Sequence, residues 1–198
     1  VLETAREHIK ESDGDEFPAV EILEDLSGRG TPTHLNEEVL DQLLDEVGYQ
    51  SGSRRNVLLT NLYRGQRRAG HAEYEVDHIF PRGRLSERDY LEKHGVKPER
   101  VDWYEDHRDH IANLQLLSSD GENQSKGDRD FSDWLERVEA GDVRNLTGKE
   151  DYFDTHRIPR DEAVHEYPQF ERFLMGDSGR KQLIKEVLEQ TLPLRDSG

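Results

Sequence analysis

Apolar residues recur at helical spacing along most of this chain, whereas only two short segments have the pattern of a β-strand. Helices are expected at 16–26, 37–47, 55–63, 86–95, 131–140, 162–175 and 181–192. The strands are expected at 74–77, which alternates between apolar and polar residues, and at 111–117. Polar stretches at 118–127 and 141–154 are expected to be a loop and a connector. The pattern therefore predicts an α+β fold that is mostly helical.

The helix expected at 37–47 has signals at both ends. Asn36 suits the N-cap position, and Glu37 and Glu38 place negative charge in the first turn, where the helix dipole favours it. Gly48 follows the last apolar residue and can stop the helix.

Nothing in the sequence points to a membrane or an oxidising compartment. No apolar run approaches the roughly 18 residues that a spanning helix needs, and no secretory signal opens the chain. The absence of cysteine excludes disulfides and thiolate zinc sites. A cytoplasmic location is the default expectation. Because the sequence opens with Val1 and not with methionine, it is expected to be a fragment of a longer protein.

The overall charge is strongly negative, at −17. Taken alone, this charge argues against nucleic acid as a partner, because phosphates are repelled by such a surface. Arginine outnumbers lysine and acidic residues are spread along the whole chain, as in proteins of salt-loving organisms. In strong salt, repulsion is screened within roughly 3 Å at 1 M, so local charge matters more than the total.

One segment reverses this charge locally. From Ser51 to Ala72 the sequence has no Asp or Glu. The arginines of this segment are Arg54, Arg55, Arg64, Arg67 and Arg68. The residues that follow add Arg82 and Arg84. Two interpretations are open: the arginines pair with acidic residues elsewhere in the fold, or they form a phosphate-contacting face beside an active site.

Polar residues suited to catalysis occur in three short motifs. Asp77 and His78 lie in VDHIFP, at the expected end of the first strand, and Asn113 lies in IANLQLL, at the expected start of the second. Asn123 and Lys126 lie in NQSK, in the polar stretch before the helix at 131–140. Each motif alone is weak, but their order along strand, strand and helix is specific in combination.

This order resembles the HNH, or ββα-metal, nuclease superfamily. The sequence is similar to the HNH domain of CRISPR nucleases in VDHI…P and N…K. It is more similar to the C-terminal HNH domains of modification-dependent restriction proteins, the GmrSD-like and SspE-like group. There VDHIFP, NLQLL and a late HRIP…FERFL stretch before a terminal helix have counterparts. The resemblance covers most of the chain from Leu35 onward.

The resemblance implies an HNH core inserted among packed helices. An N-terminal helical segment and linker would occupy 1–33, the nuclease core with its basic flanking helix 34–140, and a C-terminal helical part 141–198. It also implies a DNA endonuclease that is the effector of a restriction or phage-defence protein. Proteins of this group carry an N-terminal nucleotide-binding domain that senses modified DNA. No G-x-x-x-x-G-K phosphate-binding loop occurs in this sequence, so the sensing domain would lie in another part of the full-length protein.

The residue types suit phosphodiester hydrolysis. As a neutral imidazole, His78 can take a proton from water. Asp77 and Asn123 offer a carboxylate and an amide oxygen, which suit a divalent metal ion, Mg²⁺ or Mn²⁺ above others. By resemblance, Asn113 braces the loop or ring that sets His78. The residues expected to hold DNA phosphates are Arg82, Arg84, Lys126, Arg64, Arg67 and Arg68.

A single such set of residues predicts one hydrolytic centre, and therefore nicking of duplex DNA. Little sequence preference is expected, because no recognition-helix signature or zinc finger is present. The chain also lacks the Cys-x-x-Cys pairs that hold a structural zinc in many HNH domains. Asn123 stands where histidine is common in this superfamily, which favours Mg²⁺ over Zn²⁺ or Ni²⁺.

Two alternatives stay open. The cluster Asp106–His110 could bind a metal by itself, or it could be a charged loop before the second strand. The domain could also be an HNH-shaped nucleic-acid-binding or protein-docking module with little catalysis. The joint presence of Asp77, His78 and Asn123 argues against that function, since an inactive copy would be free to lose one of them.

Overall fold

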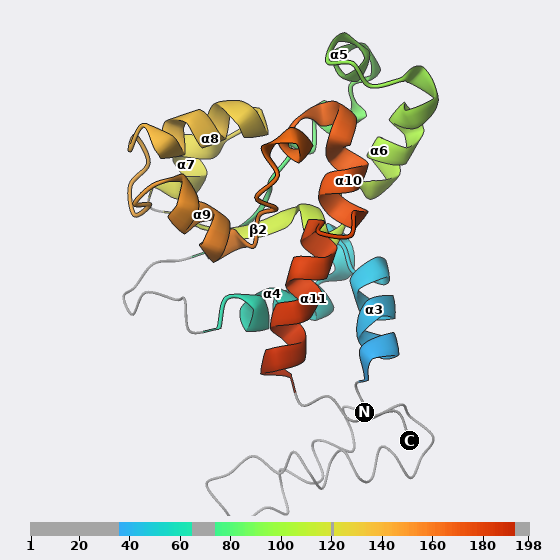
Figure 1. The fold of residues 1–198 in the computed structure, drawn as a ribbon, viewed down its shortest axis with the longest axis vertical. Helices are drawn as coiled ribbons and strands as arrows, with labels where there is room; N and C mark the ends of the chain where they lie inside the picture. Colours follow the sequence, from blue (N-terminus) through green and yellow to red (C-terminus); the bar gives the residue numbers. More distant parts are fainter. Residues whose placement is uncertain (1–35, 65–73, 120, 193–198) are drawn as a thin grey trace, which may run out of the picture. The chain divides into compact units, whose positions relative to one another are not determined.

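The computed structural model describes residues 36–64, 74–119 and 121–192 (Figure 1). The segment expected to be helical at 16–26 lies outside the described residues, as do Arg67 and Arg68. The α-helices, labelled as in Figure 1, are α3 (Glu37–Glu46), α4 (Ser53–Leu62), α5 (Arg88–Lys93), α6 (Val101–His107), α7 (Glu122–Lys126), α8 (Phe131–Glu139), α9 (Lys149–His156), α10 (Phe170–Met175) and α11 (Arg180–Thr191). The 3-10 turns are η1 (Tyr49–Ser51), η2 (Arg84–Ser86), η3 (Pro98–Arg100), η4 (Ile111–Asn113), η5 (Glu162–His165) and η6 (Tyr167–Gln169).

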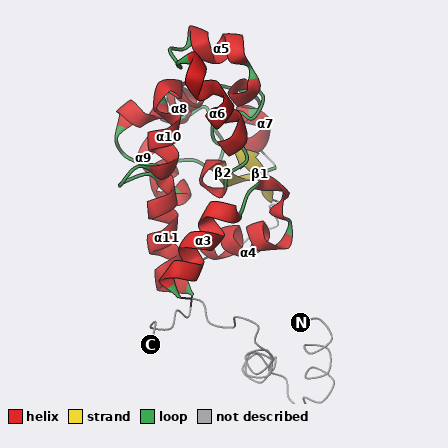
Figure 2. Ribbon diagram, turned by 90° about the vertical axis from the view of Figure 1, so that its right-hand side faces the viewer, coloured by secondary structure: helices red, strands yellow, loops and turns green. Residues whose placement is uncertain are grey.

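Within the described residues, two short antiparallel strands form one sheet. β1 (Tyr74–His78) pairs with β2 (Leu114–Ser118), so that Asp77 lies opposite Gln115 and His78 lies opposite Leu114. Figure 2 shows the strands, in yellow, as a small part of a largely helical structure. The prediction of an α+β fold that is mostly helical is therefore confirmed.

Local signals account for several helices. The Asn36 side-chain oxygen accepts a hydrogen bond of 2.8 Å from the Val39 amide and so caps α3. The helices expected at 55–63, 131–140 and 181–192 appear as α4, α8 and α11. α4 packs against α11. The buried apolar residues of these two helices are Leu58, Leu59, Leu62, Ile184 and Leu188.

An aromatic cluster joins the end of β1 to the C-terminal helices. Phe80, two residues after β1, is fully buried, and its ring centroid lies 5.2 Å from that of Phe131 on α8. The centroids of Phe170 and Phe173, both on α10, lie 5.1 and 5.0 Å away. Edge-to-face contacts of this kind add stability beyond the buried area. The FERFL stretch therefore packs directly behind the turn that follows Asp77 and His78.

Several expected boundaries were wrong. The loop expected at 118–127 contains α7, the connector expected at 141–154 contains most of α9, and α6 precedes β2 where no helix was expected. The helix expected at 162–175 is divided into η5, η6 and α10. Proline lacks an amide hydrogen and disfavours helical geometry in the residue before it, and Pro168 lies at this break.

The larger compact unit of the chain comprises Asp41–Leu192. Residues on both sides of the expected boundary at 140 belong to this unit. Among the residues that the structure describes, no helix combines the length and the apolar character needed to span a membrane.

Candidate active site

One face of β1 is directed toward α7. Alternate residues of a strand share a face, so Glu75 and Asp77 lie on the same side. The Asn123 amide nitrogen donates to the Glu75 carboxylate, and the Lys126 ammonium lies 3.0 Å from Asp77 Oδ2. Positions 123 and 126 are one helical turn apart and face the same side of α7. The NQSK motif therefore lies against the YEVDH strand, although 48 residues separate Glu75 from Asn123.

A chain of buried hydrogen bonds fixes the Asp77 carboxylate. Asp77 Oδ2 accepts 3.0 Å hydrogen bonds from Gln115 Nε2 and from the Lys126 ammonium. Gln115, on β2, in turn accepts a 2.7 Å hydrogen bond from the Tyr152 hydroxyl on α9. Gln115 and Tyr152 are both fully buried. The orientation of Asp77 is thus set by residues from β2, α7 and α9.

Lys126 is buried, with 1% of its side chain exposed. Besides its pairing with Asp77, its ammonium donates a 2.6 Å hydrogen bond to the His78 carbonyl. Burial lowers the pKa of Lys126, and the Asp77 charge opposes this shift. The ammonium is therefore directed into the site, where it holds two neighbouring groups of β1, and not toward solvent, where a DNA phosphate was expected to meet it.

Asn113 clamps the backbone that follows His78. Its side-chain oxygen accepts a 2.9 Å hydrogen bond from the Phe80 amide, and its nitrogen donates to the carbonyls of Phe80 (3.1 Å) and Arg108 (2.8 Å). Asn113 is fully buried and lies in η4, just before β2, where a strand residue was expected. Because all of its polar atoms are engaged with backbone groups, Asn113 acts on the shape of the turn.

Arg180, the first residue of α11, is fully buried and contacts the backbone of η4. Its guanidinium donates 2.9 Å hydrogen bonds to the carbonyls of Ala112 and His156. His156 also bonds the Tyr63 hydroxyl at 2.8 Å, and burial lowers its pKa to about 3. The C-terminal helices therefore hold the residue that precedes Asn113.

His78 lies at the end of β1 with 12% of its side chain exposed. Its Nε2 atom is 2.9 Å from Asp109 Oδ1, and its ring centroid lies 4.9 Å from that of Tyr49. Burial lowers the pKa of His78, and the Asp109 charge opposes this shift. A lowered pKa leaves the imidazole mainly neutral near pH 7, the form that can accept a proton.

Asp109 joins His78 to Arg82. Arg82 Nε lies 2.9 Å from Asp109 Oδ1, and its Nη2 lies 3.3 Å from Oδ2. Burial favours the neutral carboxyl, but hydrogen bonds from Arg82 and His78 outweigh it and hold the Asp109 pKa below its ordinary value. The sequence had indicated Asp109 only as part of the Asp106–His110 cluster, and Glu75 not at all.

The Asp106–His110 cluster does not converge on one point. His107 stacks on Trp103, with ring centroids 3.9 Å apart, and donates from Nδ1 to the Trp103 carbonyl. His110 Nδ1 accepts a hydrogen bond from the Ala112 amide, while Asp109 turns to His78. Within residues 36–64, 74–119 and 121–192, no group of three or more His, Asp or Glu side chains could hold a metal ion.

The arginines divide between local pairing and exposure. Arg54 lies 3.7 Å from Glu46, and Arg55 donates to the Tyr49 carbonyl and to Asn56. Arg64 follows α4 and is exposed. The first of the two open interpretations, pairing with acidic residues of the fold, therefore applies to Arg54, whereas the contacts of Arg55 are to a carbonyl and an amide oxygen.

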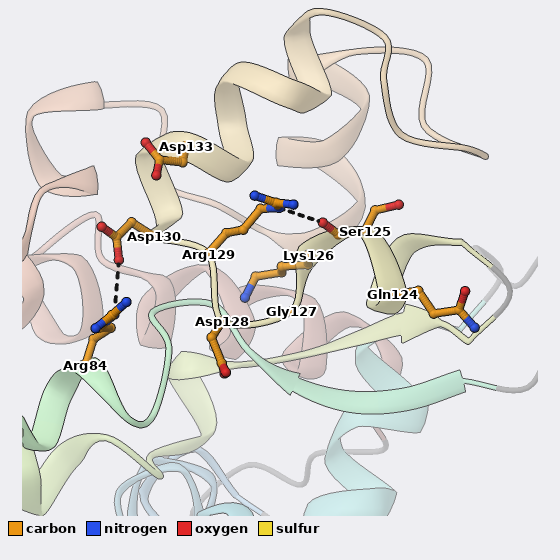
Figure 3. Close-up of a pocket in the computed structure, with 9 residues that line it drawn as sticks. All are labelled: Arg84, Gln124, Ser125, Lys126, Gly127, Asp128, Arg129, Asp130 and Asp133. Atoms are coloured by element: carbon orange, nitrogen blue, oxygen red, sulfur yellow. Dashed lines mark hydrogen bonds and ion pairs between the residues drawn. The ribbon is translucent and has the colours of Figure 1, made fainter.

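A polar pocket of about 390 Å³ lies beside Lys126 (Figure 3). Arg84 lies 3.9 Å from Asp130 across it and 3.2 Å from Glu87 outside it. The side chains that line the pocket are those of Arg84, Gln124, Ser125, Lys126, Asp128, Arg129, Asp130 and Asp133. Because basic and acidic groups balance here, the pocket has no strong preference for either sign of charge.

The oxygen atoms between β1 and α7 form the chemically distinctive part of the site. Glu75 and Asp77 contribute carboxylates and Asn123 contributes an amide oxygen, which are donors that hard divalent cations prefer. The Asn123 nitrogen is directed at Glu75, which turns its oxygen away from that carboxylate. Asp77 Oδ2 is already engaged, so Oδ1 is the atom that remains for an ion.

Comparison with models of known protein families gave no match, and comparison with curated protein sequences gave none.

Proposed function

We propose that this chain is a metal-dependent DNA endonuclease module of the HNH, or ββα-metal, type. The observation that carries the proposal is the arrangement of β1, β2 and α7. Asp77 and His78 end β1, Asn113 clamps the turn that follows them, and Asn123 approaches β1 from α7. This spatial arrangement accords with the order of the three motifs along the sequence.

In the proposed reaction His78 is the general base. A water oxygen attacks phosphorus, its proton passes to the His78 imidazole, and the bond from phosphorus to the leaving oxygen breaks. Asp77 and Asn123 would hold the divalent ion, with Glu75 beside them. When bound, Mg²⁺ or Mn²⁺ stabilises negative charge on the phosphate and on the leaving oxygen. Lys126 positions Asp77 and the backbone of His78, a role that replaces the phosphate contact expected from the sequence.

The proposed partner is duplex DNA, bound with little sequence preference. Arg82 and Arg84 follow His78 in sequence, and each makes an ion pair, Arg82 with Asp109 and Arg84 with Glu87. The exposed pair of Arg84 with Glu87 contributes about 0–1 kcal/mol, so a phosphate can replace that carboxylate. Arg82 would meet a phosphate while it stays paired with Asp109. Arg64, Arg67 and Arg68 would extend this basic region. By the resemblance, the module would be the effector of a restriction or phage-defence protein with a separate sensing domain.

The test is a supercoiled-plasmid assay with Mg²⁺ or Mn²⁺, and with a chelator as the blank. The open-circular form should appear first, and linear product later as nicks accumulate. His78→Ala should lower the rate by about 10²–10⁴-fold while leaving the fold and DNA binding intact. His94→Ala is the matched control, because His94 is an exposed histidine at the end of α5. Wild-type cleavage by His78→Ala, or immediate linear product at limiting enzyme, would contradict the proposal.

The alternative is a catalytically weak domain that binds nucleic acid or protein. The contact between Lys126 and Asp77 favours it, because the ammonium occupies one of the two carboxylate oxygens and leaves only Oδ1 for an ion. Titration with Mn²⁺ separates the two functions. Under the nuclease proposal, Asp77→Ala and Asn123→Ala should both weaken Mn²⁺ binding, and high Mn²⁺ should partly restore cleavage by Asn123→Ala. Unchanged affinity in both variants would favour the alternative.

A further inference from the structure

The contact between His78 and Asp109 determines which ring nitrogen carries the proton. A neutral imidazole has one N–H donor and one acceptor nitrogen, and an ionised carboxylate can only accept. Asp109 Oδ1 lies 2.9 Å from His78 Nε2, so the proton must be on Nε2 for this contact to be a hydrogen bond. Among the described residues, no hydrogen-bond partner faces Nδ1.

Asp109 is itself held from two sides. The Arg82 guanidinium donates hydrogen bonds to both Asp109 carboxylate oxygens, at 2.9 and 3.3 Å. On the backbone side, the Tyr49 amide donates a 2.7 Å hydrogen bond to the Asp109 carbonyl, and the Ile111 amide donates a 3.0 Å hydrogen bond to the Val47 carbonyl. Two backbone hydrogen bonds therefore join the segment Val47–Tyr49 to residues 109–111.

Gly48 explains how closely these two segments approach. A Cβ atom at Gly48 would lie 2.6 Å from the Asp109 carbonyl oxygen, a distance that real Cβ atoms essentially never show. Gly48 was expected only to stop the preceding helix, yet the absence of its side chain lets Tyr49 reach both the Asp109 backbone and the His78 ring. The junction between α3 and η1 therefore contributes to the placement of His78.

We propose that Asp109 is a positioning residue that holds neutral His78 with its proton on Nε2 and leaves Nδ1 as the basic atom. Arg82 and the Val47–Tyr49 segment keep Asp109 in place for this role. The assignment of the proton is a property of the folded chain alone. Only its consequence for catalysis, that Nδ1 receives the proton of water, rests on the proposed function.

The primary experiment is ¹⁵N NMR of the His78 ring in the full chain, without metal or DNA, at a pH where the imidazole is neutral. We expect a protonated Nε2 with a slowly exchanging hydrogen and an unprotonated Nδ1. In Asp109→Ala that slow exchange should be lost. Asp109→Asn keeps an acceptor oxygen of the same shape and should partly restore it. Asp106→Asn, which alters an exposed acid of the same cluster, should leave the signal unchanged. A proton on Nδ1, or unchanged exchange in Asp109→Ala, overturns the proposal.

The second measurement is the rate of plasmid nicking by the same variants. Loss of a residue that orients a catalytic group lowers activity by about 10–100-fold in comparable sites. Asp109→Ala should show that loss in kcat with little change in KM, and Asp109→Asn should recover part of it. If wild-type protein does not nick DNA, the proposed function fails, while the NMR result still decides the proton assignment. If it nicks and Asp109→Ala nicks equally well, the positioning role is overturned and the nuclease proposal stands.

Discussion

Lys126→Met should destabilise the fold by removing a buried charge that pairs with the candidate site. The Lys126 side chain is 1% exposed, and its ammonium contacts Asp77 Oδ2 at 3.0 Å and the His78 carbonyl at 2.6 Å. Methionine is also unbranched and flexible, so it fills most of the same space and tests the charge more than the packing.

The size of the expected loss of stability depends on the surroundings of the Asp77 carboxylate once the Lys126 ammonium is removed. Removing one partner of a fully buried ion pair costs about 3–5 kcal/mol, because the other charge stays uncompensated. Asp77 is 18% exposed and keeps its hydrogen bond from Gln115, so it is partly solvated without Lys126. Burial also lowers the pKa of Lys126, so removing the ammonium relieves some desolvation cost. We therefore expect a loss of about 2–3 kcal/mol, or about 4–12 °C in Tm for a chain of this size.

The assay is urea and thermal unfolding of wild type, Lys126→Met, Asp77→Asn and the double variant. The double-variant cycle should give a coupling above about 0.5 kcal/mol, because the two residues are in contact. Lys93→Met, at an exposed position on α5, should stay within about 0.5 kcal/mol of wild type. A Lys126→Met protein as stable as that control, or an additive cycle, would refute the reasoning.

Three further predictions concern the core, the pH dependence and DNA binding. Phe80→Ala should lower the free energy of unfolding in urea by about 3–5 kcal/mol, because its ring is enclosed by four others; a change below about 1 kcal/mol would contradict the aromatic cluster. Burial lowers the pKa of His156 to about 3, so between pH 6.5 and 3 the unfolded chain binds a proton that the native state does not. The free energy of unfolding should therefore fall as the pH drops through this window, and more steeply than in His156→Gln; equal slopes would exclude His156 as a cause. Replacing Arg64, Arg67 and Arg68 by Gln should reduce the log–log salt slope of DNA binding by roughly 0.9 per lost phosphate contact, whereas an unchanged slope would indicate pairing within the protein.

The motif residues show which parts of the candidate site residue type and sequence order can identify. The chemistry and sequence order of Asp77, His78 and Asn113 resemble those of a nuclease superfamily. The structure brings the turn after His78 against Asn113, through two hydrogen bonds between Asn113 and Phe80. The assigned chemistry of these residues remains a proposal, and the backbone clamp is a property of the fold.

Helix α7 shows why periodicity missed part of the site. Its sequence, ENQSK, has no apolar residue, so no hydrophobic pattern indicates a helix. The helix is held by polar contacts at both ends: Glu122 accepts a 2.9 Å hydrogen bond from the nearby Ser118 amide, and Lys126 reaches β1 across 48 residues. Helix α9 was missed for a related reason, since its buried Tyr152 lies within a polar segment expected to be a connector.

By itself, the sequence determined those elements whose signals are local. Asn36 marks the start of α3, and the apolar stripe of α8 and the alternation at 74–77 specify one helix and one strand. Only the tertiary structure decided which side chains meet: Asp109 with His78 across 31 residues, and Lys126 with the His78 carbonyl across 48. The reason is physical. Helix caps and apolar periodicity act between neighbours in sequence, whereas the partner of a buried polar group depends on how distant elements pack, and no local pattern encodes that.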